Sequence, residues 1–139
     1  AKMTAKEYLG QAYRLDQRIN SKLEQIRSLR DLTTKATATM SDMPFSGSRN
    51  VYRMQDIISK IVDLENEINR DIDALVDLKR EMVTTIKAVT DPECQTLLEL
   101  RFLCFKTWEQ IAVEMDYSIQ HIYRLRDRAL KMITPPPVA

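Results

Sequence analysis

Glycine is nearly absent from this chain, which has only two in 139 residues, and this shortage limits the folds open to it. Tight turns between strands depend on glycine, so a fold built mainly from strands is disfavoured. Leu, Ile, Lys, Arg, Glu and Asp are abundant, and most of these residues favour helices. Hydrophobic residues make up 44% of the chain, which is enough to form a core. The composition therefore predicts an all-α protein.

Residues that carry enzyme chemistry are also scarce. The chain has one histidine and two cysteines, Cys94 and Cys104, too few for a disulfide framework or a metal cluster. We interpret the two cysteines as semi-buried free thiols. No phosphate-binding loop or nucleophile–base pair is recognisable, and a single histidine leaves little general acid–base chemistry at neutral pH. We predict no enzymatic activity, no cofactor and no metal site.

Long apolar runs are missing as well. No run approaches the ~20 residues of a membrane-spanning helix, and no signal peptide is visible, so we expect a cytoplasmic protein without membrane contact. The net charge of +1 does not by itself favour a polyanionic partner. The segment from Ser118 to Lys131, however, contains four basic residues and one acid. A prediction of nucleic-acid binding therefore depends on this local excess.

Residues 1–90 contain two long amphipathic stretches. "TAKE", Thr4 to Glu7, is a capping box that begins the first helix. Apolar residues then follow at steps of three and four: Leu9, Ala12, Leu15, Ile19, Leu23, Ile26 and Leu29. "SDMPFSGSRN", at 41–50, combines Pro and Gly with polar residues and indicates a loop at about 40–50.

The second stretch carries a sustained heptad. One position is filled by Met54, Ile61, Ile68, Leu75, Met82 and Val89, and a second by Ile58, Ile72 and Ile86, with Glu65 and Lys79 as interruptions. Such a repeat favours packing along another helix. We predict that residues 1–90 form a long antiparallel helical hairpin, a coiled coil. The same stripes could instead pair between subunits.

The C-terminal third predicts a compact unit of three helices. "TDP" at 90–92 ends one helix and starts another, and "TPPPVA" ends the last, leaving residues 135–139 as a Pro-rich tail. Three short amphipathic segments lie between, at about 91–103, 107–115 and 119–133. Thr107 and Ser118 are expected to cap the second and third, and Asp116 suits a left-handed turn between them. We predict a helix-turn-helix domain at 91–134.

The last segment has two different faces. A helical period places Ile122, Leu125, Ala129 and Ile133 on one side and Gln120, Arg124, Arg128 and Lys131 opposite. The first face is suited to packing and the second to an anionic partner, although an ordinary solvated surface would have the same composition. Arg126 projects towards the packing side, where we expect it to snorkel or pair with an acid.

Residues 91–133 resemble region four of bacterial sigma factors, the helix-turn-helix that reads the promoter −35 element. The resemblance depends on "LELRF" at 98–102 and on Thr107, Glu109, Ile111, Ala112, Ser118, Ile122, Leu125, Arg128, Ala129 and Leu130. No region two is present, which argues against a complete sigma factor. With its long helices and "MPFSGS", nearly the whole chain resembles the phage and prophage late-gene transcriptional regulators of the RinA and ArpU type.

The sigma-like resemblance implies a set of DNA-contacting residues: Ser118, Gln120, His121, Tyr123, Arg124, Arg128 and Lys131. Gln120, Tyr123 and Arg124 are the candidates for base edges or the adjacent backbone, and Arg128 for a phosphate. His121 faces the same side and could either contact DNA or be an ordinary exposed histidine. Ile119 occupies a position that is usually Arg in primary sigma factors, which implies a different target sequence.

Three functions fit these expectations. The leading hypothesis is a sequence-specific DNA-binding transcriptional regulator of phage or prophage type, which binds double-stranded DNA and forms a homodimer or docks a partner through the hairpin. An alternative is a protein-interaction module that binds RNA polymerase or another protein without reading DNA. A further alternative is a DNA-packaging protein like a small terminase subunit, although those usually carry the DNA-binding part first.

Overall fold

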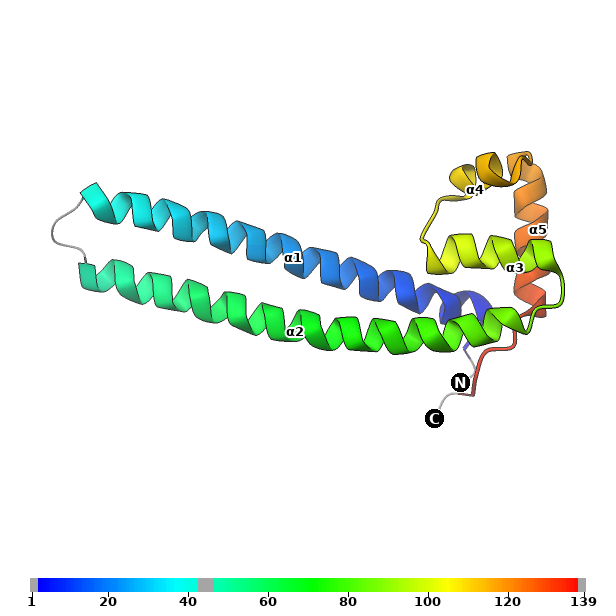
Figure 1. The fold of residues 1–139 in the computed structure, drawn as a ribbon, viewed down its shortest axis with the longest axis horizontal. Helices are drawn as coiled ribbons and strands as arrows, with labels where there is room; N and C mark the ends of the chain where they lie inside the picture. Colours follow the sequence, from blue (N-terminus) through cyan, green and yellow to red (C-terminus); the bar gives the residue numbers. More distant parts are fainter. Residues whose placement is uncertain (1–2, 43–46, 138–139) are drawn as a thin grey trace. The chain divides into compact units, whose positions relative to one another are not determined.

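The structure, a computed structural model, describes residues 3–42 and 47–137. Over these ranges it contains helices and no strand, which confirms the predicted all-α class. Its elements are α1 (Ala5–Asp42), α2 (Gly47–Lys87), α3 (Pro92–Leu98), the π-helix η1 (Glu99–Leu103), α4 (Trp108–Met115) and α5 (Ile119–Met132) (Figure 1). No helix in the described ranges has both the length and the apolar character needed to span a membrane.

The chain divides into two compact units. One consists of Asp16–Ala74, and the other combines Ala1–Leu15 with Leu75–Ala139. The two long helices each contribute to both units. The boundaries predicted from the sequence, at residues 90 and 134, stay a prediction.

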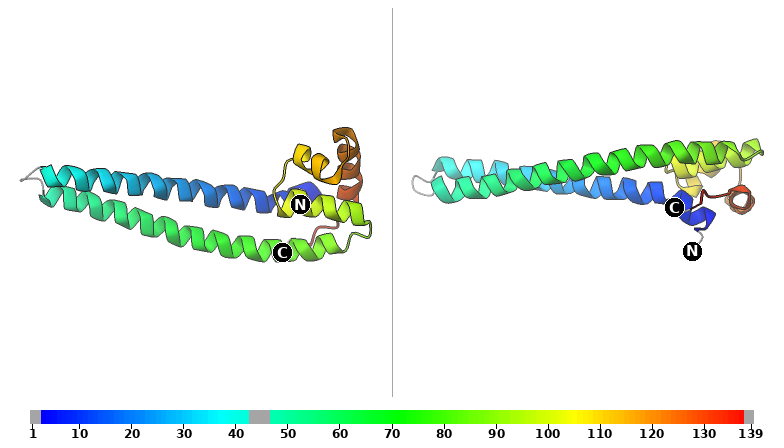
Figure 2. Two further views of the ribbon diagram at one scale, coloured as in Figure 1. Left: turned by 45° about the horizontal axis from the view of Figure 1, so that its top comes forward. Right: turned by 90° about the horizontal axis from the view of Figure 1, so that it is seen from below.

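In the unit of residues 16–74, α1 and α2 run side by side in opposite directions (Figure 2). Lys22 Nζ lies 2.7 Å from Asp71 Oδ2, and Arg30, further along α1, lies 3.8 Å from Glu65, which comes earlier in α2. Rising numbers on α1 thus match falling numbers on α2. Among the side chains of this unit that the structure describes, the buried ones are Ile19, Ile26, Ile61 and Ile68. Ile61 and Ile68 belong to the predicted series in which apolar residues recur every seven residues. This series therefore marks a packing seam.

The second predicted heptad position is largely exposed within this chain. Ile58 is 50% exposed and Ile72 is 41% exposed, and only Ile86 of this series is buried. Ile57 and Leu64 are half-buried instead. A seam needs positions three or four residues away from the main series, and both choices satisfy that spacing. The periodicity could not choose between them, because the position of α1 decides which flank of α2 is covered.

The predicted loop at about 40–50 is shorter than expected at both ends. α1 continues to Asp42 and α2 begins at Gly47, while residues 43–46 lie outside the described part of the chain. The Thr33 and Thr37 hydroxyls donate hydrogen bonds to backbone carbonyls one turn earlier. Once a long helix has formed, each further residue adds one backbone hydrogen bond. Thr-rich and Ala-rich sequence can therefore continue α1 without large apolar side chains.

The unit of residues 1–15 and 75–139 contains a larger core. The Thr4 amide donates to Glu7 Oε2 at 3.2 Å and the Glu7 amide to Thr4 Oγ1 at 3.1 Å, which confirms the predicted capping box. α5 packs against both α3 and α4. Every helix of this unit except η1 supplies fully buried side chains: Leu9, Met82, Ile86, Leu97, Leu98, Ile111 and Ile122. This core fixes one face of α5.

The predicted helix at 91–103 changes its winding halfway along. Asp91 caps its start and Pro92 occupies the first turn, as expected, but α3 passes into η1 at Glu99. The Cys104 amide donates to the Glu99 carbonyl at 3.1 Å, an i to i+5 bond that widens this turn. Phe105 then adopts a left-handed φ of 59°. A uniform helical period in the sequence gives no sign of this change.

The thiols also differ from expectation. Instead of two semi-buried cysteines, Cys94 is fully buried and Cys104 is exposed. Cys94 faces the core from α3, whereas Cys104 follows the end of η1. Burial raises the pKa of the Cys94 thiol, which therefore stays protonated at neutral pH.

Candidate nucleic-acid interface

α4 begins at a capping box that fixes its first turn. The Thr107 amide donates to Gln110 Oε1 at 2.9 Å, and the Gln110 amide donates to Thr107 Oγ1 at 3.2 Å. Ile111 and Ala112 are buried, and Trp108 is half-buried on the same side. The expected cap of this helix is confirmed.

A tight turn joins α4 to α5. Asp116 has φ 59° and ψ 46°, the left-handed conformation predicted for it. The Tyr117 amide donates to the Ala112 carbonyl at 3.0 Å. The Tyr117 hydroxyl donates to Glu93, and this hydrogen bond raises the pKa of Tyr117. The turn is thus attached to α4 through the backbone and to the start of α3 through a side chain.

Ser118 fixes the start of α5. Its hydroxyl accepts a hydrogen bond from the His121 amide at 3.2 Å, as predicted for an N-cap. A capped helix start next to a rigid turn leaves α5 little freedom at the end that carries Gln120. The first turn of α5 is therefore a well-positioned surface.

α5 has one buried face and one exposed polar face. Ile122, Leu125 and Ala129 are at most 2% exposed and pack towards α3 and α4. The opposite face carries four exposed polar or basic side chains, which we call the outer face of α5: Gln120, Arg124, Arg128 and Lys131. The structure thus brings together the four residues that the helical period had placed on one side.

Arg126 is held against the body of the unit. Its Nε lies 3.0 Å from Asp127 Oδ1, and its guanidinium group lies 4.9 Å from the centre of the Tyr123 ring and 5.7 Å from that of Trp108. Both contacts are favourable for a cation over an aromatic face. Arg126 thus pairs with an acid and packs on rings, as expected from its position on the packing side.

Arg128 has a partner that the sequence did not suggest. Its Nη2 lies 3.6 Å from Asp91 Oδ2, and its side chain is 57% exposed. Asp91 also caps α3, because it accepts hydrogen bonds from the amides of Glu93 and Cys94. The two residues are far apart in the sequence, and nothing in either local pattern indicates the contact. Asp91 thus holds the guanidinium end of the Arg128 side chain near the start of α3, while much of this side chain stays open to solvent.

The remaining predicted residues flank the outer face. The His121 ring lies 4.3 Å from the Tyr117 ring, and the Tyr123 ring contacts Arg126. Both His121 and Tyr123 are half-buried, whereas Ser118 is exposed. The structure therefore places the seven candidate residues along one helix but gives two of them packing roles as well.

Arg101 is a basic residue of this unit that sequence reasoning did not single out. Its guanidinium group lies 4.8 Å from the Trp108 ring centre, and it donates to the Lys106 carbonyl at 2.9 Å. Arg101 thereby links η1 to the start of α4. A role in orienting α4 is invisible from its helical position alone.

A family model described as "Protein of unknown function (DUF1492)" matches residues 34–134. The chain belongs to this family. The matched segment includes all of α2 to α5 and the end of α1, so the whole outer face of α5 lies inside it. No curated protein and no solved structure matches the chain.

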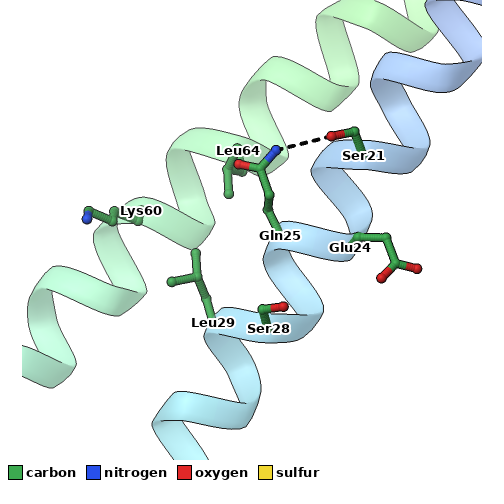
Figure 3. A pocket seen from close by; sticks show the side chains of 7 residues that line it. All are labelled: Ser21, Glu24, Gln25, Ser28, Leu29, Lys60 and Leu64. Atoms are coloured by element: carbon green, nitrogen blue, oxygen red, sulfur yellow. Dashed lines mark hydrogen bonds between the residues drawn. The ribbon is translucent and has the colours of Figure 1, made fainter.

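A separate hollow of about 610 Å³ lies between α1 and α2 in the unit of residues 16–74. Its walls are formed by Ser21, Glu24, Gln25, Ser28, Leu29, Lys60 and Leu64 (Figure 3). Gln25 donates to Ser21 at 3.4 Å, and the side chain of Lys60 points away from α1. Its one acid and one base come from different helices and do not converge. This hollow therefore has no recognisable chemistry.

Residues 3–42 and 47–137 contain no group of three His, Cys, Asp or Glu side chains that could hold a metal ion. A smaller hollow of about 320 Å³, in the unit that contains α5, has basic side chains in its wall. Two of these already donate to backbone carbonyls: Arg14 to that of Glu7 and Arg101 to that of Lys106. The outer face of α5 therefore remains the strongest candidate site.

Proposed function

We propose that this protein is a sequence-specific DNA-binding transcriptional regulator of phage or prophage type. In this proposal α3, α4 and α5 form a helix-turn-helix domain like sigma region four, α5 enters the major groove, and the long helical hairpin serves dimerisation or partner docking. The observation that carries the proposal is the state of α5. One face is locked in a core, its start is capped, and its outer face exposes Gln120, Arg124, Arg128 and Lys131, with the acid Asp127 among them.

The start of α5 is the part suited to reading bases. Recognition helices usually present their N-terminal residues to base edges. Gln120 and Arg124 lie one turn apart on the exposed side of this region. A glutamine amide can bind adenine and an arginine guanidinium can bind guanine, each through two hydrogen bonds. These two residues would therefore supply most of the sequence preference.

The later part of α5 is suited to the DNA backbone. Arg128 and Lys131 lie on the outer face beyond Arg124, where a recognition helix normally leaves the base edges. Contacts between basic side chains and phosphates position a protein without reading sequence, and they weaken as salt rises. Because Asp91 pairs with Arg128, it would set the direction in which this guanidinium group meets a phosphate.

The proposal is tested by selecting bound sequences from a random pool of duplex DNA and then measuring variants at several salt concentrations. Arg124→Ala should cost about 1–3 kcal/mol on the selected sequence and relax its preference. Arg128→Ala should weaken selected and scrambled DNA alike and reduce the salt slope by about one phosphate contact. Arg126→Ala should mainly lower stability.

Arg80→Ala is the matched control, because Arg80 is an exposed arginine of the same unit on α2. It should bind DNA like the parent chain. Failure of the parent to enrich any sequence, or equal losses for Arg80→Ala and Arg124→Ala, would contradict the proposal.

A protein-binding role for the same domain is the second candidate, and one observation favours it. Val113 on α4 is 82% exposed, the largest exposed fraction among the exposed large hydrophobic side chains of the described residues. Covering an exposed apolar side chain is favourable, and a protein partner such as RNA polymerase could cover this one. Binding to purified RNA polymerase that Val113→Asp abolishes, without any enrichment of DNA, would favour this function.

A further inference from the structure

α2 carries a second seam that α1 does not cover. We define the α2 stripe as five exposed residues of the unit 16–74: Ile58, Val62, Glu65, Asn69 and Ile72. They follow one another at steps of four, three, four and three, which is the spacing of a coiled-coil seam. Val62 and Asn69 come one residue, or about 100°, after Ile61 and Ile68, and the other three members point between these two directions.

The apolar part of this stripe is substantial. Ile58, Val62 and Ile72 are 50%, 49% and 41% exposed, although all three are β-branched residues suited to helix packing. Residues 16–38 of α1, whose side chains the structure describes, have nothing comparable. The exposed leucines of α1 in this unit, Leu23 and Leu32, are nine residues apart and therefore point to opposite sides of the helix. The stripe is thus a feature of α2 and not a general property of the unit.

We propose that the α2 stripe binds the same stripe of a second copy of this chain, with the two α2 helices antiparallel. A two-fold axis beside residue 67 places Val62 opposite Ile72 of the partner subunit, and Glu65 opposite Asn69 of the partner subunit. The same symmetry repeats both contacts on the other side of the axis. A stripe that matches itself in this way is what a two-fold dimer requires.

The polar residues decide the direction. In a parallel pair in register, Glu65 would meet Glu65 of the partner subunit, and two like charges inside a seam repel each other. In the antiparallel pair, the Asn69 amide can donate to the Glu65 carboxylate of the other copy. Polar contacts inside a seam fix the register of a coiled coil.

The ion pair that Glu65 already makes is compatible with this arrangement. Arg30 lies 3.8 Å from Glu65, with the two side chains 66% and 50% exposed. A carboxylate has enough acceptor positions for both a guanidinium group and an amide. Glu65 can therefore keep Arg30 at the edge while it accepts from the second copy.

This inference deepens the proposed function. The dimer itself does not depend on DNA binding, and only its role on DNA rests on the proposed function. Two copies would bring two helix-turn-helix domains to one DNA molecule. Self-association is measured without DNA, so that a failure of DNA binding and a failure of the stripe remain distinguishable.

The first experiment is sedimentation equilibrium of the full chain without DNA, over about 5–500 µM, since association of identical chains depends on their concentration. Ile72→Lys places a charge in the stripe, and Leu32→Lys is the matched control on α1, at a residue 49% exposed. The parent should form dimers. Ile72→Lys should raise the dissociation constant at least about tenfold, because it removes the burial of one large apolar side chain from each copy.

Leu32→Lys should associate like the parent. Circular dichroism of both variants checks that their helices are intact, which is expected because both positions are partly exposed. A parent chain that stays monomeric throughout, or an equal loss of association in the two variants, would overturn the proposal.

The second experiment tests the direction by disulfide formation. In a Cys104→Ser background, which removes the exposed native thiol, Val62→Cys chains are mixed with Ile72→Cys chains and oxidised with oxidised glutathione. The antiparallel pair should give the mixed 62–72 disulfide. Val62→Cys alone should not cross-link, because its two copies would lie about 15 Å apart along the helices. Efficient cross-linking of Val62→Cys with itself would overturn the antiparallel arrangement.

Discussion

Asp91 is expected to stabilise the helical unit through its cap and not through its charge. It accepts hydrogen bonds from the Glu93 amide at 2.9 Å and the Cys94 amide at 3.4 Å, and it also lies 3.6 Å from Arg128 Nη2. Asp91→Ala removes both interactions. Asp91→Asn keeps the acceptor that caps α3 but removes the charge, and Arg128→Ala removes only the ion pair.

The structure gives the expected order of effects. Loss of an N-cap acceptor costs about 0.5–2 kcal/mol, typically about 1, and asparagine caps as well as aspartate. The ion pair contributes little because the Arg128 side chain is 57% exposed and solvent screens the interaction. Asp91→Ala should therefore lower the free energy of unfolding by about 1 kcal/mol. Asp91→Asn and Arg128→Ala should stay close to the parent.

Urea unfolding followed by circular dichroism measures the stability of the three variants. Amide hydrogen exchange gives a local readout, because Asp91→Ala leaves the Glu93 and Cys94 amides without their acceptor and should speed their exchange. Asp91→Asn should not. If Arg128→Ala were as destabilising as Asp91→Ala, or if asparagine failed to rescue, the cap would not be the source of the stability.

Three further changes follow from single contacts. Ser118→Ala removes the cap of α5 and should cost about 1 kcal/mol in urea unfolding, with faster exchange of the His121 amide as the local sign. Ile122→Ala removes a fully buried side chain and should cost about 2–5 kcal/mol in the same assay, whereas a loss below about 1 kcal/mol would contradict its core position. A hydrogen bond from Lys22 lowers the pKa of Asp71 below the usual 3.8. This contact stabilises the fold above that pH and is lost as the pH falls through the lowered value, so the stability of Asp71→Asn should fall less than that of the parent between pH 7 and pH 3.

The sequence by itself determined the features that depend on neighbours along the chain. The caps at Thr4, Thr107 and Ser118 and the left-handed turn at Asp116 are all present where they were expected. Each depends on hydrogen bonds or backbone angles within a few residues, so local side-chain chemistry is sufficient. The apolar side of α5 could be predicted for the same reason, because the helical period assigns each residue to a face.

Tertiary structure alone decided which of several permitted surfaces is covered. The heptad of α2 allowed either flank of Ile61 to join the seam, and the position of α1 covered Leu64 and left Ile58 exposed. On α5, Arg128 pairs with Asp91, the N-cap of α3, whereas the Arg126 guanidinium group lies over the Trp108 ring of α4. A helical period gives the direction of a side chain from its own axis, but the partner belongs to a distant part of the chain. Only packing of the helices brings the two together.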